Sequence, residues 1–272
     1  MPTTDKNPAV SIVMGVRYQR SDTSLLERSV RSILAQSFTN FEFLICQNDS
    51  TSEAVALLNQ LAAEDKRIRL IDGTGTDSLT KKLNRCIFQA RGIWLARMDD
   101  DDVSYPDRFD HQIAFLQEHT NIAAVGCCVR EIDDEMAHVR MLPPFPQLRD
   151  FRVTFPFVHP TLVLRRDAVE AVGGYSENTL QEGCDDYDLL LRMYGMGYRA
   201  ANVQKVLLDY SVVSSQLSHR PYRLFYNEFR TRMAQFGALG LLPRWLIWAG
   251  KPLATGLLPR RLLYRIKRLL GR

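Results

Sequence analysis

Several signatures of common protein classes are absent from this 272-residue sequence. The five cysteines form no Cys-x-x-Cys pair, and Asp and His are not spaced with them as in a zinc site. The glycine-rich fingerprint of a dinucleotide-binding Rossmann domain is missing, since Gly15 is followed by Val16-Arg-Tyr-Gln, and there is no P-loop. A nucleotide bound by this chain would therefore need its phosphates neutralised by other means, such as a metal ion.

A signal peptide and a confident membrane span are also absent. Residues 1–8 are polar and lack the apolar core of a signal peptide. The stretch 239–258 is apolar, but Pro243, Arg244, Lys251 and Pro252 interrupt it. Together with an odd, scattered set of cysteines, these features predict a protein of the reducing cytoplasm.

Acidic residues are missing from the end of the chain. None follows Glu228, whereas ten Lys and Arg residues lie between Arg230 and Arg272. Since these ten charges exceed the net charge of +4 by six, the preceding residues carry a net charge of −6. A basic end of this kind indicates an anionic partner surface, either a membrane or a nucleic acid.

The first half of the chain alternates apolar, strand-like segments with segments of helical spacing. Strands are predicted at 10–16, 41–46, 68–71 and 93–98, and helices at 23–36, 52–63, 78–90 and 106–118. This alternation predicts an α/β fold with a mostly parallel central sheet and helices on both faces. In the second half we predict a strand at 161–165, a short helix ending near 171–175 and a helix at 185–194.

Four consecutive aspartates, Asp99 to Asp102, follow the fourth predicted strand. Like charges at this spacing repel one another unless a cation neutralises them, and ligands bind at the carboxyl ends of parallel strands. The run does not fit an EF-hand loop, because Ser104 occupies the sixth position, where glycine is needed. Taken alone, it fits a solvated loop equally well.

Together with three further motifs, this run resembles glycosyltransferase family 2. The segment 96–109, Ala-Arg-Met-Asp-Asp-Asp-Asp-Val-Ser-Tyr-Pro-Asp-Arg-Phe, is close to the family's Ala-Arg-Met-Asp-x-Asp-Asp segment. His159-Pro-Thr, Gly173-Gly-Tyr and Asp185-Asp-Tyr-Asp-Leu-Leu-Leu-Arg follow in the family's order. The resemblance covers about residues 9–215 and implies a GT-A fold.

The resemblance implies an inverting, metal-dependent enzyme that moves a sugar from a nucleotide-diphosphate sugar, with a UDP-sugar favoured. The acceptor would be a hydroxyl of a glycan or of a polyprenyl-diphosphate-linked glycan in surface polysaccharide or lipopolysaccharide synthesis. Asp99 and Asp101 match the Asp-x-Asp pair, with Asp101 expected to bind Mn²⁺ or Mg²⁺ directly and Asp99 to contact the metal or the ribose. Asp102 would orient the donor sugar or the cluster, and Asp100 would be dispensable.

The remaining site residues follow from the same resemblance. Asp186 matches the catalytic aspartate, which accepts the proton of the acceptor hydroxyl. Asp185, which replaces a glutamate, and His159 are assigned to the acceptor side. For Asp185 and Asp186, capping of a helix is the alternative role.

The residues at positions expected to bind the nucleotide differ more from the family pattern than the aspartate run does. Gln47 and Asn48 lie where the family has acidic residues that read the base, and Asp49 stands in place of a glycine. Asn84 lies where the family approaches the nucleotide, although a solvated helix face explains it as well. In the late Tyr-Arg-x-His segment of the family, Ser211 replaces the arginine.

These patterns predict a catalytic domain at 1–215, with a nucleotide-binding half at about 9–130 and an acceptor half at about 131–215. Residues 216–272 form a helical, basic extension, with helical spacing at 221–236 and 259–270. Residues 259–270 suit a helix on an anionic membrane surface, with packing on the catalytic domain as the alternative. We therefore expect a cytoplasmic protein at the inner face of the cell membrane.

Two other functional classes fit parts of the sequence. A sugar nucleotidyltransferase would carry a glycine-rich, basic loop after the first strand, which Val16-Arg-Tyr-Gln-Arg-Ser does not supply. A basic nucleic-acid-binding protein would show salt-sensitive binding but leaves the aspartates unexplained. We therefore expect no nucleic-acid partner.

Overall fold

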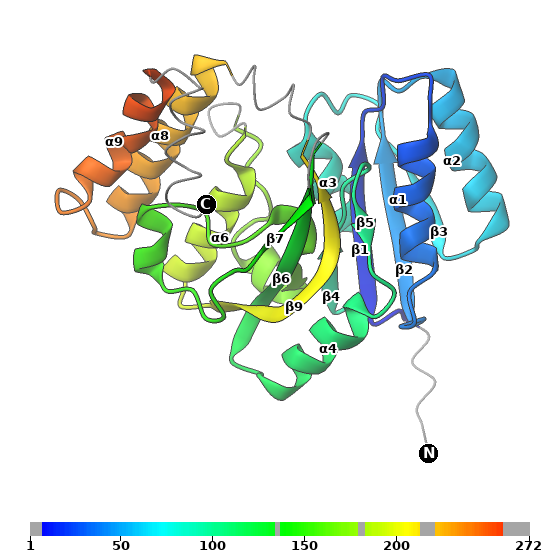
Figure 1. Ribbon diagram of the computed structural model, residues 1–272, viewed down its shortest axis with the longest axis horizontal. Coiled ribbons are helices and arrows are strands. Elements are labelled where there is room, and N and C mark those ends of the chain that lie inside the picture. The colour runs from blue at the N-terminus through cyan, green and yellow to red at the C-terminus, as the bar shows by residue number, and fades with distance from the viewer. Residues whose placement is uncertain (1–6, 134–136, 179–182, 213–220, 258–272) are drawn as a thin grey trace.

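The computed structural model describes residues 7–133, 137–178, 183–212 and 221–257. Within these ranges the chain forms one mixed, nine-stranded sheet with helices packed around it (Figure 1). Eight strands lie in the order β3-β2-β1-β4-β8-β6-β9-β5, and β7 pairs with β6 beside this path.

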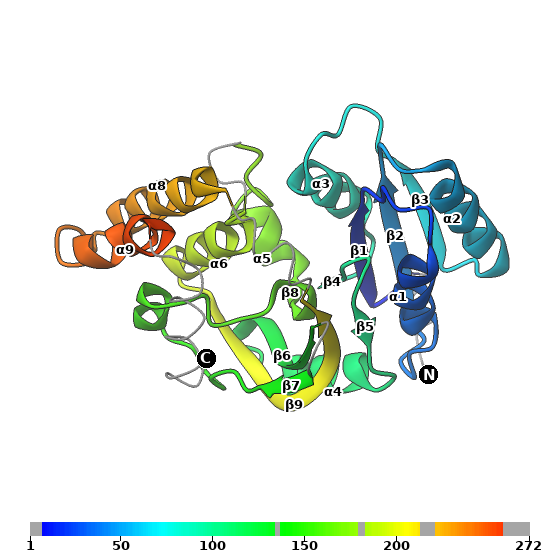
Figure 2. The same ribbon diagram turned by 45° about the horizontal axis from the view of Figure 1, so that its top comes forward.

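The first part of the sheet is parallel, as the alternating pattern predicted. It contains β1 (Val10–Val16), β2 (Phe41–Gln47), β3 (Ile68–Asp72) and β4 (Trp94–Arg97). The helices between them are α1 (Ser24–Leu34), α2 (Ser52–Glu64) and α3 (Leu79–Gln89). Ile12 and Met14 of β1 belong to the core that α1 and α2 cover, whereas Val13 belongs to the core under α3 (Figure 2). The strands are therefore buried on both faces.

Beyond β4 the sheet becomes mixed. The strand β8 (Val163–Arg165) runs antiparallel to both β4 and β6 (Ile122–Ile132), which is itself parallel to β9 (Arg199–Ser211). Two short strands complete the sheet: β5 (Val103–Ser104) pairs with β9, and β7 (Ala137–Arg140) with β6. The helices of this part are α4 (Arg108–Glu118), α5 (Arg166–Ala171) and α6 (Asp185–Gly195), with short 3-10 helices η1 (Leu148–Arg152) and η2 (His159–Thr161).

The extension contains α8 (Tyr222–Ala238) and α9 (Leu246–Leu257), which lie side by side next to α6 (Figure 1). Phe236 and Trp245 meet edge to face with ring centroids 5.0 Å apart, in the same core as Leu190 of α6. The buried Arg232 pairs with Glu228 and donates to the Arg152 carbonyl at 2.8 Å. The described part of the extension thus packs on η1 and α6.

The structure describes only part of the basic chain end. The helix α9 continues through Lys251 and Pro252, although these residues interrupt the apolar stretch 239–258 in the sequence. Among the described helices, none has the length and apolar character needed to cross a bilayer. The segment 259–270, for which membrane binding was predicted, lies outside the described residues.

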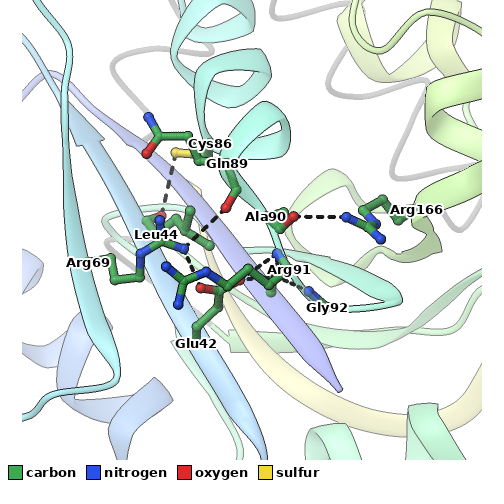
Figure 3. A network of polar contacts seen from close by, with 10 residues as sticks. Glu42, Leu44, Arg69, Cys86, Gln89, Ala90, Arg91, Gly92 and Arg166 are labelled. Carbon is green, nitrogen blue, oxygen red and sulfur yellow. Dashed lines mark hydrogen bonds and ion pairs between the residues drawn. The ribbon is translucent and has the colours of Figure 1, made fainter. Parts of the chain in front are cut away.

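A buried carboxylate stabilises the edge where the parallel strands begin. Glu42 of β2, only 5% exposed, accepts hydrogen bonds from the Ser11 hydroxyl and the Arg91 amide, both at 2.7 Å, and from Arg69 Nη1 at 2.5 Å (Figure 3). Arg69 also reaches the Gln89 carbonyl at 3.2 Å. At Gly92 an added Cβ would lie 2.6 Å from the Ser11 nitrogen, so the chain passes too close for a side chain. This network therefore fixes where β4 starts.

We predict that Glu42→Ala lowers the free energy of unfolding by about 3 kcal/mol, since it leaves the Arg69 guanidinium and two buried donors without their acceptor. Chemical denaturation measures this change. The matched control is Glu64→Ala, which removes an exposed pair with Arg31 and should cost less than about 0.5 kcal/mol. Equal effects of the two substitutions would contradict a structural role for Glu42.

Candidate active site

The aspartate run lies in the turn between β4 and β5, where three backbone contacts hold it in place. Ser29 of α1 donates its hydroxyl to the Asp99 carbonyl at 2.6 Å. Ser211, the last residue of β9, donates its hydroxyl to the Asp101 carbonyl at 2.6 Å and its amide to Asp102 Oδ1 at 2.8 Å. The run is therefore fixed between the first helix and the end of a strand from the second half of the chain.

Two buried arginines lie behind the aspartates. The Arg97 side chain is 1% exposed and pairs with Asp99 through Nη2, while its Nη1 donates to the Met98 carbonyl. Arg108 donates through Nη2 to the carbonyls of Arg97, at 3.0 Å, and Pro160, at 2.8 Å. These bonds join the end of β4 to η2, so a positive charge and a rigid backbone support the acidic turn from inside.

The aspartate side chains are crowded enough to perturb one another. Burial, with the charge of Asp99 second, raises the pKa of Asp100 to about 7, of Asp101 to about 6 and of Asp102 to about 9. Asp102 is fully buried, and its Oδ2 has no hydrogen-bond partner among the described residues. A cluster of this kind gains most from a nearby cation, because the cation favours the ionised forms that burial and repulsion oppose.

The oxygen donors of this turn fit a hard divalent ion, but they form only part of a coordination shell. In the described ranges, no group of three or more His, Cys, Asp or Glu side chains is arranged to hold an ion. Mg²⁺ and similar ions are commonly bound through one or two carboxylates, with substrate phosphates and water completing the shell. Asp99 and Asp101 fit that arrangement, and their metal-binding roles stay predictions.

Asp186 lies in the first turn of α6 and belongs to the same electrostatic site as the aspartate run. It is half-buried, and Asp186 Oδ1 accepts a hydrogen bond of 2.8 Å from the Tyr187 amide. Burial raises the pKa of Asp186 to about 6, an effect that Asp99 adds to and that the Tyr187 bond and Arg97 oppose. Burial and the neighbouring Asp186 raise the pKa of Asp185 to about 7. A half-buried carboxylate with a pKa near neutrality suits a general base.

Tyr210 is a member of the site that the sequence analysis passed over. Burial raises its pKa, and the charges of Asp99, Asp102, Asp186 and Asp101 raise it further, in that order. Its phenol therefore lies among both groups of carboxylates, at the end of β9. Tyr210 matches the tyrosine of the family's Tyr-Arg-x-His segment and was therefore identifiable from the sequence. The prediction for this segment concerned only Ser211, which replaces the arginine.

His159 lies on η2 and contacts Tyr175, whose hydroxyl is 2.8 Å from His159 Nε2. Burial, with the positive charge of Arg97 second, lowers the pKa of His159 well below its usual value. The imidazole is therefore neutral near pH 7. A contact between His159 and an acceptor stays a prediction.

Asn84 of α3 has a well-defined structural role. Its Nδ2 donates to the Tyr175 carbonyl at 2.8 Å, and its Oδ1 accepts from the Tyr175 amide at 2.9 Å. Gly174, which precedes Tyr175, has φ of +71°, and an added Cβ would lie 2.8 Å from Asn84 Oδ1. The side chain thus holds the Gly-Gly-Tyr turn against α3, and the predicted contact with the donor would be additional.

The end of β2 places Gln47 and Asn48 at the same sheet edge as the aspartates, since Val13 of β1 is level with both Leu44 and Arg97. Asn48 donates to the Thr76 carbonyl at 2.7 Å. Asp49 has φ of +56°, a left-handed conformation that glycine adopts more easily than aspartate, and its carboxylate accepts from Arg17 Nε at 2.9 Å. Base recognition by Gln47 and Asn48 stays a prediction.

Comparison with known proteins gives consistent matches. A sequence model of the family described as Glycosyl transferase family 2 matches residues 11–173. The putative glycosyltransferase EpsE of Bacillus subtilis (strain 168) is 30% identical over 263 residues, which are 96% of this chain and 94% of that protein. An Escherichia coli protein named UDP-Gal:alpha-D-GlcNAc-diphosphoundecaprenol beta-1,3-galactosyltransferase is 24% identical over 215 residues, which are 76% of this chain and 75% of that protein.

Among solved structures, a mannosyltransferase from Pyrobaculum calidifontis in complex with GDP-Man and Mn²⁺ superimposes with a TM-score of 0.61. It is 21% identical, and the match covers 97% of this chain and 81% of that one. This likeness concerns the fold, and it confirms the expected GT-A architecture with its central sheet, surrounding helices and C-terminal helices.

We predict that Asp101→Asn lowers the Mn²⁺-dependent affinity for a nucleoside diphosphate by about tenfold or more, because the carboxylate expected to bind the metal loses its charge. Titration calorimetry with UDP and with GDP, each with and without Mn²⁺, measures the effect. The adjacent Asp100→Asn is the matched control and should change the affinity by less than about twofold. If both substitutions had the same effect, Asp101 would have no special role.

Proposed function

This chain belongs to glycosyltransferase family 2, and we propose that it transfers a sugar from a nucleoside-diphosphate donor to an acceptor hydroxyl with inversion of the anomeric carbon. The observation that supports this most directly is the meeting of two acidic segments in one electrostatic site. Asp99 and Asp186 are far apart in the sequence, yet the charge of Asp99 raises the pKa of Asp186. Sugar transfer needs one carboxylate group near the leaving diphosphate and another near the attacking hydroxyl.

We propose that Asp99 and Asp101 bind the donor side through Mn²⁺ or Mg²⁺. Such an ion, when bound, stabilises the negative charge that develops on the leaving diphosphate. The chain itself holds the carboxylates in position: Ser29 and Ser211 bind the backbone of the run, and Arg97 pairs with Asp99. Asp102 fixes the turn through the Ser211 amide.

On the acceptor side, Asp186 accepts the proton of the attacking hydroxyl. The Tyr187 amide orients one carboxylate oxygen, and half-burial keeps the basicity above that of an exposed aspartate. A single base on the face opposite the leaving group gives attack in line with the breaking bond, and hence inversion. Asp185 and His159 would contact the acceptor.

The donor and acceptor classes are proposed from the relatives. The Escherichia coli relative is named for a UDP-sugar donor and a diphosphoundecaprenol-linked acceptor, whereas the solved mannosyltransferase is in complex with GDP-Man. We propose a UDP-sugar as donor and a glycan, free or linked to a polyprenyl diphosphate, as acceptor. The reaction would serve surface polysaccharide or lipopolysaccharide synthesis at the cytoplasmic face of the cell membrane.

The test is the binding of a panel of nucleotides and sugar nucleotides, with and without Mn²⁺, followed by transfer assays with the donor that binds. We expect Mn²⁺-dependent binding of one sugar nucleotide, with UDP-sugars first. Metal-independent binding of a nucleoside triphosphate and a sugar phosphate would instead indicate a nucleotidyltransferase. Absence of binding to every nucleotide would contradict the proposed function.

We predict that Asp186→Asn lowers transfer by about a thousandfold while the nucleotide affinity stays near that of the wild type, because the amide cannot accept a proton. In the wild type only ionised Asp186 is active, so the rate should rise with pH up to about 6 and then level off. Initial rates from pH 5 to 8 at saturating Mn²⁺ and donor measure both effects.

Asp185→Asn changes the neighbouring residue in the same helical turn and serves as the control. It should raise the KM for the acceptor but keep the fall in rate below pH 6. A loss of folding in Asp186→Asn, full activity, or an unchanged acid limb in that variant would show that Asp186 is not the base.

A further inference from the structure

The helix α9 exposes an apolar face that nothing in the described part of the chain covers. Ile247 and Leu257 are 85% and 75% exposed, and Leu246 is 50% exposed. Leu246 and Leu257 lie eleven residues apart, close to three helical turns, and Ile247 lies roughly 100° around the helix from Leu246, so the three side chains form one broad apolar face. On the opposite side Trp245 and Ala249 are buried in the same core as Leu190 of α6, and Pro252 is buried as well.

The charges around this face have one sign. No Asp or Glu follows Glu228, and the described cations of the extension are Arg223, Arg230, Arg232, Arg244 and Lys251, of which Arg232 pairs with Glu228. Arg244 is exposed directly before α9. Tyr222 of α8, 46% exposed, borders the end of α9, since a Cβ added at Gly256 would lie 3.0 Å from Tyr222 Cε2.

Exposed aliphatic side chains, an amphipathic tyrosine and the exposed Arg244, in a segment with no acidic residue after Glu228, form the pattern of a helix that lies in a membrane interface. The helix has 12 residues, too few to span a bilayer and enough to lie along one. An acidic protein partner would fit the charges, but it would not need Ile247 and Leu257 so fully exposed. The combination therefore favours a phospholipid surface.

We propose that Tyr222, Arg244, Leu246, Ile247 and Leu257 form a docking face that binds anionic phospholipid membranes. This inference rests on the proposed function, since a lipid-linked acceptor would be found at that surface. It assigns membrane contact to α9 itself, independently of the segment 259–272.

A packing contact links the helix pair of the docking face to the candidate active site. Gly183, just before Asp185 and Asp186, has φ of +78°, and a Cβ added there would lie 3.3 Å from Leu224 Cδ2 in the first turn of α8. The start of α8 thus touches the segment that leads to the proposed base. A membrane bound to the α8–α9 pair would hold Asp186 at a fixed position relative to the lipid surface.

The experiment is co-sedimentation of the full chain with vesicles of phosphatidylcholine alone or mixed equally with phosphatidylglycerol. The wild type should bind the anionic vesicles, and Ile247→Glu/Leu257→Glu should lower the partition coefficient by about tenfold or more. The matched control is Phe88→Glu/Ile93→Glu, which places the same two charges at side chains that are 91% and 62% exposed elsewhere. This control should bind like the wild type.

Mn²⁺-dependent nucleotide binding and the melting temperature should be unchanged in both double variants, which separates docking from folding and from the proposed catalytic function. Wild-type binding of the Ile247/Leu257 variant would overturn the proposal. The proposal would also be overturned if deletion of residues 259–272 abolished vesicle binding while Ile247→Glu/Leu257→Glu had no effect on it. A dimer that only this variant disrupts, with vesicle binding retained, would identify the face as a self-association surface instead.

Discussion

The repulsion between carboxylates gathered at one sheet edge is the constraint on which the rest of the structure depends. Asp99 to Asp102 occupy a single turn, and Asp186 is close enough for the charge of Asp99 to raise its pKa. Bringing such groups together out of water is costly, so the surroundings must hold them there. The fold does so with a buried guanidinium at Arg97, with hydroxyls from Ser29 and Ser211, and with Arg108, which binds the backbone behind the turn.

The parts of the fold set by local pattern could be predicted from the sequence. The strands of the parallel half are continuous apolar segments, and their helices show clear amphipathic spacing, so both were found close to their observed bounds. The two longest strands, β6 and β9, were missed. The first is rich in Ala, Gly and Cys, and the second interrupts its apolar residues with Asn202, Gln204 and Lys205, while register shifts disturb their pairing.

The site was predictable to the extent that motifs mark it. The acidic run and Asp186 were identified from their motifs, and the structure brings them into one electrostatic site. Contacts between distant segments were not predictable. Nothing in the local sequence indicates that Asn84 holds the turn at Tyr175, or that Tyr210 lies among four carboxylates. The left-handed conformation of Asp49 was foreshadowed only by the glycine expected at that position.

The two bonds of Ser211 determine which residues position 211 can tolerate. At the end of β9, the Ser211 hydroxyl donates to the Asp101 carbonyl and the Ser211 amide donates to the Asp102 carboxylate, 109 or more residues earlier in the chain. Alanine at position 211 would leave the Asp101 carbonyl without this donor but would keep the amide that binds Asp102. The bond to Asp102 needs only a backbone amide, so any residue except proline at position 211 can supply it, whereas the bond to the Asp101 carbonyl needs a side-chain donor there.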